Sequence, residues 1–298
     1  MPADLARRLA AVPGPIRGAV WMMGSTASWA VMAVLIRYVS DEIHAFEIVF
    51  LRSLFGMVFL LPWLYRSGIK GLHTQRFGMH FARAFFGLVA AYLIFTAITL
   101  DSLGSIAAIM TTRPIFASAA AILILREASH GRRWSAAILG FVGALIILRP
   151  GMVEVSTGAL LAFIGVFAMA AVAIIMKSLA RTERPDAMAT WQMVIFVPAS
   201  LVPALFVWTT PGWEAVAVLL AMGCAGTLTQ RALARAYHAA DATVVLPFEF
   251  TRLIFAAAIG LAVFGEFPDL WVWIGGAVIL AGIVTMAGLE ARRAPVRD

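Results

Sequence analysis

The chain has 298 residues, of which 62% are hydrophobic and only 13% are charged, and its mean hydropathy is +0.92. A soluble globular protein is typically about half apolar and about a quarter charged, so this composition excludes an ordinary soluble domain. The formal charge is +7, but the basic residues are dispersed between apolar runs, which argues against a nucleic-acid partner.

Apolar runs of about 20 residues recur along the chain, and each is long enough for a hydrocarbon core of roughly 30 Å. They lack the alternation typical of a membrane β-barrel strand, so we expect an all-α membrane protein. The loops between the runs are too short to hold a catalytic or nucleotide-binding domain. Ten transmembrane helices are predicted, at residues 18–38, 44–65, 79–99, 102–125, 133–149, 156–178, 187–208, 214–235, 240–264 and 270–289.

The basic residues predict the orientation of these spans. Most of the 23 lysines and arginines lie in segments on the same side as the N-terminus, whereas the other side holds only Arg37 and Arg149. The positive-inside rule therefore places both termini in the cytoplasm. The remaining arginines, which lie within the spans, are Arg52, Arg83, Arg113 and Arg252.

The two halves of the chain resemble each other. Residues 111–149 align with residues 250–288 without a gap, and TTRPIF meets FTRLIF, so that Arg113 matches Arg252. Each half carries five spans, and because five is odd, the second half enters the membrane in the opposite direction. Such inverted-topology repeats are typical of many secondary transporters. The predicted organisation is a cytoplasmic tail at 1–17, a first five-helix repeat at 18–150, a second at 151–289 and a cytoplasmic tail at 290–298.

In each half a glutamate follows the fourth span (ILREASHGRRW and VFGEFPDLW), and the fifth span is rich in glycine. With these features the chain resembles the drug/metabolite transporter superfamily, and within it the ten-span EamA-type members, most of all the YddG-type bacterial amino-acid exporters. The resemblance implies a central cavity between the halves and export of aromatic and other neutral amino acids across the bacterial inner membrane. We expect a monomer in the lipid bilayer, with a dimer as the alternative.

Glu249 is the carboxylate predicted to lie deep in a span, and its spacing from Arg252 puts both on one helix face. One interpretation is that these two neutralise each other and lock the ninth span. Arg113 would then be available for a substrate carboxylate, which arginine binds through a two-pronged hydrogen bond. Alternatively, Arg113 bonds carbonyl groups freed by Pro114. Pro114 and Pro247 interrupt their helices, either to expose backbone groups to a ligand or to set a kink.

Aromatic side chains near mid-span would suit an amphipathic solute if they line a cavity, although such residues also simply pack helices. His80 lies one turn from Arg83, where it either gates or binds substrate or sits at the level of the lipid headgroups. The candidate substrate-binding residues are Arg113, Arg252, Glu249, Trp29, Tyr92, Phe250 and His80. Phe85 is a further candidate for the wall.

The sequence favours a secondary transporter that exports small neutral amino acids by alternating access. No G-x-x-x-x-G-K-[ST] motif is present, so we expect no direct use of ATP and no cofactor. An ion pair would make Glu249 a poor proton carrier, which favours facilitated diffusion over weak proton coupling. The alternative is an exporter of another metabolite or a drug on the same fold. A membrane enzyme is the remote alternative, because the histidines are scattered and no Cys–His constellation occurs.

Overall fold

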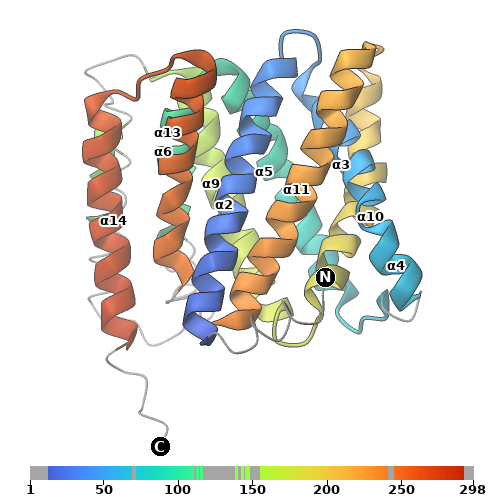
Figure 1. Cartoon of the computed structure of the whole chain (residues 1–298), viewed down its shortest axis with the longest axis horizontal. Coiled ribbons are helices and arrows are strands. Elements are labelled where there is room, and N and C mark those ends of the chain that lie inside the picture. Colours follow the sequence, from blue (N-terminus) through green and yellow to red (C-terminus); the bar gives the residue numbers. More distant parts are fainter. Residues whose placement is uncertain are drawn as a thin grey trace, which may run out of the picture.

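The computed structural model describes residues 13–68, 72–110, 112–113, 115–116, 138–139, 142–143, 145–147, 155–240 and 245–291. Within these ranges the chain is helical, with short connections and no strand. The helices stand side by side as one bundle (Figure 1). They are α2 (Gly14–Val39), α3 (Ala45–Val58), α4 (Leu61–Ser67), α5 (Phe77–Leu100), α6 (Leu103–Met110), α9 (Thr157–Leu179), α10 (Pro185–Leu205), α11 (Trp213–Ala239), η2 (Leu246–Phe250), α13 (Thr251–Phe264) and α14 (Leu270–Ala291).

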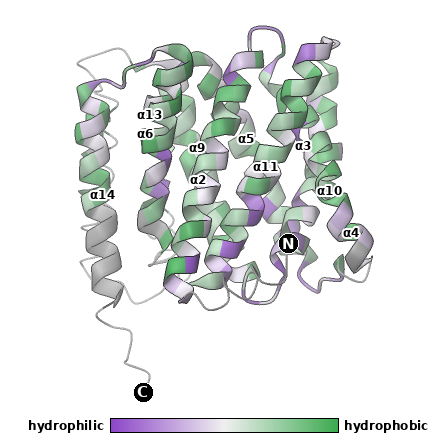
Figure 2. Ribbon diagram, in the orientation of Figure 1, coloured by the Kyte–Doolittle hydropathy of each residue, from purple (hydrophilic) through white to green (hydrophobic). Residues whose placement is uncertain are grey.

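The long helices have the length and composition of membrane spans. Within the described ranges, five helical segments are long and apolar enough to cross a bilayer alone: Gly14–Val39, Phe77–Leu100, Thr157–Met176, Pro185–Leu205 and Trp213–Ala239. Most residues along the helices are hydrophobic, and hydrophilic residues occur as isolated segments of the helices and in the connections between them (Figure 2). The chain is therefore an all-α, multi-pass membrane protein, as its composition predicts.

Two of the predicted spans are interrupted. Residues 44–65 were expected as one helix, but the structure divides them into α3 and α4 at a turn over Phe59 and Leu60. Pro62 lies in the first turn of α4, where its missing N–H costs no helical hydrogen bond. The ninth span begins as the 3-10 helix η2 and becomes α-helical at Thr251. Pro114, which is predicted to interrupt the fourth span, lies outside the described residues.

Local signals in the sequence define several helix ends. The Ser156 hydroxyl accepts a hydrogen bond from the Ala159 N–H at 3.1 Å, which caps the start of α9. The His44 ring nitrogen Nδ1 accepts from the Phe46 N–H at 3.2 Å at the start of α3. Gly265 ends α13 with φ at 66°, a left-handed conformation that favours glycine.

The repeat-related helices α2 and α9 run in opposite directions. Near the end of α2, Arg37 donates to the Asp101 carbonyl oxygen at 2.7 Å, and Ser156 before the start of α9 bonds the Asp101 side chain. The end of α2 and the start of α9 therefore share one face of the bundle. At the other face Arg76, before the start of α5, donates to the carbonyl oxygen of Ser178 near the end of α9 at 2.9 Å. The repeats are thus inverted.

The helix contacts obey the same pseudo-twofold symmetry. The most extensive contacts join α2 to α11 and α5 to α9, and each pair is the symmetry counterpart of the other. The α3–α11 and α10–α5 contacts form a second related set. The fifth and tenth predicted spans meet through glycines, because a Cβ on Gly275 of α14 would lie only 2.7 Å from the Gly143 carbonyl oxygen. We call the face where α2 begins and α14 ends the terminal face (Figure 1).

Candidate functional site

Arg113 and Glu249 form an ion pair between the two repeats. Arg113 follows α6, Glu249 belongs to η2, and their side chains are 3% and 1% exposed. This corrects the sequence-based interpretation that Glu249 pairs with Arg252. Because α6 packs against α13, a partner from the other repeat reaches Glu249. A pair three residues apart on one helix is worth only about 0.2–0.5 kcal/mol, so the inter-repeat contact decides the pairing.

Arg252 has no carboxylate partner among the described residues. Its side chain is 3% exposed, and its Nε and Nη1 groups make no hydrogen bond. The guanidinium carbon lies 5.0 Å from the centroid of the Trp29 ring, in a cation–π contact between α13 and α2. The neighbouring hydroxyl groups of Thr251 and Thr26 are 2.7 Å apart and hold these two helices together. Arg252, rather than Arg113, is the buried cation available to an anionic group.

Arg113, Glu249 and Arg252 together carry one excess positive charge. Arg113 and Arg252 come from repeat-related positions, and Arg113 pairs with Glu249, which lies three residues before Arg252. A cation at a helix centre costs about 2.5–3.5 kcal/mol on insertion scales, so it is normally kept where it meets a partner or a substrate pathway. The cluster can therefore attract and orient a negatively charged group.

Arg83 is held inside the bundle by neutral acceptors. It donates to the carbonyl oxygen of Met188 at 2.7 Å, to Gln192 Oε1 at 2.8 Å and to Gln230 Oε1 at 3.3 Å. The side chain is 1% exposed, so it does not reach the lipid headgroups. Because these acceptors belong to α10 and α11, the Arg83 side chain points into the bundle and joins α5 to both helices.

His80 is also buried, in the first turn of α5 next to the terminal face. Its Nε2 atom lies 3.9 Å from Glu183 Oε1, and its ring centroid is 5.9 Å from that of Trp191. Neither ring nitrogen has a hydrogen-bond partner. The structure therefore places His80 with residues near the terminal face, and a role in gating or substrate binding stays a prediction.

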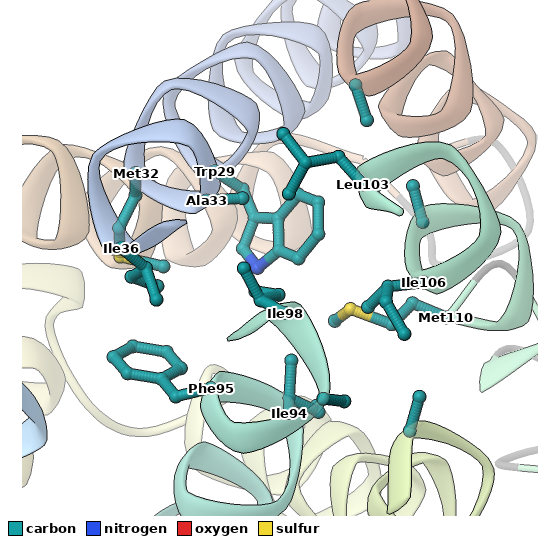
Figure 3. Close-up of a cluster of buried hydrophobic side chains, with 14 of the residues drawn as sticks. Trp29, Met32, Ala33, Ile36, Ile94, Phe95, Ile98, Leu103, Ile106 and Met110 are labelled. Atoms are coloured by element: carbon teal, nitrogen blue, oxygen red, sulfur yellow. The ribbon is translucent and has the colours of Figure 1, made fainter. Parts of the chain in front are cut away.

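The candidate aromatic residues fall into different environments. Trp29 is buried against Arg252 and belongs to the main hydrophobic cluster (Figure 3). Tyr92 packs on Phe46 with 4.7 Å between ring centroids, and its hydroxyl group has no partner. Phe250 is partly buried, and its ring lies beside Gly276 of α14. Phe85 is 55% exposed on the outside of the bundle, so it does not line an internal wall.

Sequence reasoning missed several polar residues of the bundle interior. Thr26 and Thr251 were not singled out, because hydroxyl groups within apolar runs give no distinct signal. Glu47 is fully buried at the start of α3, where the Thr209 N–H and hydroxyl both donate to its Oε2 at 2.9 Å. A glutamate near the end of a predicted span gives no sequence signal of such burial.

Polar contacts join the two repeats at both faces of the bundle. At the face opposite the terminal face, Arg37 forms an ion pair with Glu266 at 2.8 Å, and Glu266 Oε2 accepts from the Leu103 N–H at 3.2 Å. At the terminal face Arg76 reaches Ser178 Oγ at 2.7 Å. Glu266 therefore ties the loop after α13 to the end of α2 and the start of α6, whereas its repeat counterpart Glu127 lies outside the described residues.

Replacing Glu266 with glutamine is expected to loosen the face opposite the terminal face. The ion pair is partly exposed, and such pairs contribute about 0.2–1 kcal/mol, which corresponds to a rise of about 1.5- to 5-fold in the open population. Spin labels at the exposed positions Tyr38 and Phe267 would measure this as a larger fraction of long distances. Glu214→Gln is the control, and an equal change there would contradict the assignment.

The chain belongs to the EamA-like transporter family. The sequence profile of this family matches the chain twice, at residues 16–149 and 156–288, which agrees with the two inverted repeats. The family lies in the drug/metabolite transporter superfamily, as the sequence motifs predict. A solved crystal structure shares the fold with a TM-score of 0.65 at 13% identity, and the match covers 92% of this chain and 98% of that one.

Curated relatives of this EamA-like protein carry different substrate names. A riboflavin transporter of Vibrio cholerae is 30% identical, with 94% of this chain and 95% of that protein aligned. An S-adenosylmethionine uptake transporter of Rickettsia prowazekii is 26% identical, with 89% and 90% aligned. A pseudopaline exporter of Pseudomonas aeruginosa is 26% identical, with 87% and 92% aligned.

These likenesses make the EamA-like protein a transporter rather than an enzyme, with a small-molecule substrate and a lipid environment. They do not select amino acids, because these relatives are named for riboflavin, S-adenosylmethionine and pseudopaline. The choice of substrate must come from the chemistry of the buried site.

Proposed function

We propose that the protein moves small organic solutes that join a carboxylate to an apolar or aromatic part, and that neutral aromatic amino acids are the leading members of this class. The carboxylate would meet Arg252, and the aromatic part would pack in the cluster around Trp29. The observation that carries the proposal is the buried Arg252 guanidinium, which lies over Trp29 and has two unsatisfied N–H groups.

The ion pair between Arg113 and Glu249 supports this assignment. Glu249 is occupied by Arg113, so it does not compete for Arg252. An incoming carboxylate would supply two oxygen acceptors in the geometry that a guanidinium fork prefers. The solute would replace weak contacts with aromatic carbon by charge-assisted hydrogen bonds, which are roughly twice as strong as neutral ones.

Exchange between the two inverted repeats would supply alternating access. Contacts at one face, such as Arg37–Glu266, would separate while contacts at the other face, such as Arg76–Ser178, stay closed. We place the terminal face in the cytoplasm of a bacterial inner membrane, because the basic residues gather in its segments. In this orientation we propose net export by a monomeric carrier.

We propose facilitated diffusion rather than proton exchange. The buried carboxylate Glu249 is engaged by Arg113, and a carboxylate in an ion pair is a poor proton carrier at neutral pH. A pH gradient across proteoliposomes is therefore expected to leave the final solute distribution unchanged. Accumulation that follows the gradient and disappears in Glu249→Gln would overturn this part of the proposal.

The second candidate substrate is a larger planar or nucleoside-like solute. It is favoured by the relatives named for riboflavin and S-adenosylmethionine, and a planar ring could stack on the Trp29 side chain. S-adenosylmethionine also carries an amino-acid carboxylate, so it fits the same contact to Arg252.

Counterflow into proteoliposomes tests the proposal. Vesicles loaded with unlabelled phenylalanine are expected to accumulate labelled phenylalanine transiently, and excess external tryptophan should abolish the signal. Riboflavin and S-adenosylmethionine are assayed in the same way. Counterflow of either of these without any amino-acid signal would replace the leading candidate by the second. Absence of counterflow for all carboxylate-bearing solutes would overturn the proposal.

A further inference from the structure

Arg52 on α3 is, like Arg252, a buried arginine without a carboxylate partner among the described residues. Its side chain is 5% exposed, and its Nε group makes no hydrogen bond. Nη1 reaches only the Met32 sulfur at 3.9 Å, and Nη2 reaches the Ser53 hydroxyl at 3.3 Å. These are weak acceptors for a full positive charge buried in the bundle.

The surroundings of Arg52 connect it to the site at Arg252. Its guanidinium carbon lies 5.5 Å from the centroid of the Phe95 ring. Phe95, Met32 and Trp29 belong to one buried cluster between α2 and α5 (Figure 3). Met32 is three residues from Trp29, so both lie on the same face of α2. Arg52 and Arg252 therefore contact neighbouring parts of the same aromatic and thioether cluster.

The pseudo-twofold symmetry shows what is unusual about Arg52. On α10, Gln192 is matched to Arg52 by the repeat, and it lies against Gly87 of α5. Gln192 is satisfied there by Arg83, which donates to it at 2.8 Å. Arg52 lies in the symmetric place against Gly226 of α11, where a Cβ would come within 2.6 Å of Nη1. The chain thus makes room for this guanidinium but gives it no equivalent partner.

We infer that Arg52 binds a second acidic group of the transported solute, so that the carrier prefers aromatic solutes with two carboxylates over those with one. This inference rests on the proposed function, because it uses Arg252 as the contact for the first carboxylate. A solute with acidic groups at both ends of an apolar body would meet both guanidiniums and pack along the cluster between them. It would also supply the negative charge that the protein does not place beside Arg52.

Paired probes test the inference directly on the purified full-length protein in proteoliposomes. 3-Phenylpropionate and 3-(4-carboxyphenyl)propionate differ by one carboxylate at the far end of the ring. Inhibition of counterflow is expected to be about tenfold stronger for the dicarboxylate, the scale of one charge-assisted hydrogen bond. Arg52→Gln introduces the residue found at the repeat-related position and should abolish this preference. The inhibition constant of the monocarboxylate should change by no more than about twofold.

Two further variants separate recognition from folding. Arg52→Lys keeps the charge and should retain a reduced preference for the dicarboxylate. Arg83→Gln removes an arginine that the protein itself satisfies, so it should lower the melting temperature and leave the preference intact.

The outcomes distinguish the two proposals. Equal inhibition by both probes in the unmodified protein, or a preference that survives in Arg52→Gln, would overturn the inference and leave the proposed function standing. Inhibition by neither probe would overturn the inference, whereas absence of phenylalanine counterflow in the unmodified protein would overturn the proposed function.

Discussion

Replacing Arg252 with glutamine is expected to reduce substrate affinity by about 10- to 100-fold. The substitution removes a charged hydrogen-bond donor, and hydrogen bonds to charged groups are worth about 1.5–3 kcal/mol. The guanidinium has no carboxylate partner among the described residues, so its removal leaves no described carboxylate without its ion-pair partner. The fold should therefore tolerate the substitution. The concentration of phenylalanine that gives half-maximal counterflow measures the effect.

Two comparisons make the Arg252 result specific. Arg252→Lys keeps the charge but loses the two-pronged fork. Its affinity for the substrate should therefore lie between those of the unmodified protein and Arg252→Gln. Trp29→Leu should weaken the binding of aromatic solutes more than the binding of aliphatic solutes of similar size. An Arg252→Gln protein that is folded and transports with unchanged affinity would show that this arginine is structural.

Replacing Glu249 with glutamine is expected to destabilise the protein by about 3–5 kcal/mol, the usual cost of removing one partner from a buried ion pair. The change leaves the Arg113 guanidinium, 3% exposed, without its carboxylate. Loss of the folded fraction with heating in detergent, followed by fluorescence-detected chromatography, measures the change as a lower melting temperature.

The double variant Arg113→Gln with Glu249→Gln provides the decisive control, because it removes both charges and should recover much of the lost stability. The partly exposed pair of Arg37 and Glu266 is the matched comparison, with an expected cost of at most about 1 kcal/mol. If Glu249→Gln lowers the stability no more than Glu266→Gln does, the buried pair of Arg113 and Glu249 does not stabilise the fold as expected.

The architecture could be predicted because it depends on features that a sequence displays directly. Apolar length gives the spans, and the match of Arg113 to Arg252 reveals the repeat. The pairing of Glu249 could not be predicted, because it depends on the packing of α6 against α13, which only the fold creates. Local spacing pointed instead to Arg252, three residues away on the same segment.

Arg83 and Phe85 illustrate the same limit at the level of a helix face. Both lie on α5, yet Arg83 points to Gln192 and Gln230 inside the bundle, whereas Phe85 faces outward. Most residues on every face of this helix are apolar, so the hydrophobic pattern that distinguishes inside from outside in a soluble helix is weak. The division of α3 from α4 was missed for a related reason, since Pro62 is compatible with both a kink and a new helix start.

Accessibility of one buried position from both sides of the membrane tests alternating access most directly. In a Cys224→Ser background, Thr26→Cys would place a single thiol beside the helix contact that carries Trp29 and Arg252. We expect a membrane-impermeant maleimide to label it in both right-side-out and inside-out vesicles, with saturating phenylalanine protecting it on both sides. Labelling from one side alone, or labelling that no carboxylate-bearing solute affects, would contradict a substrate site between inverted repeats that open in turn.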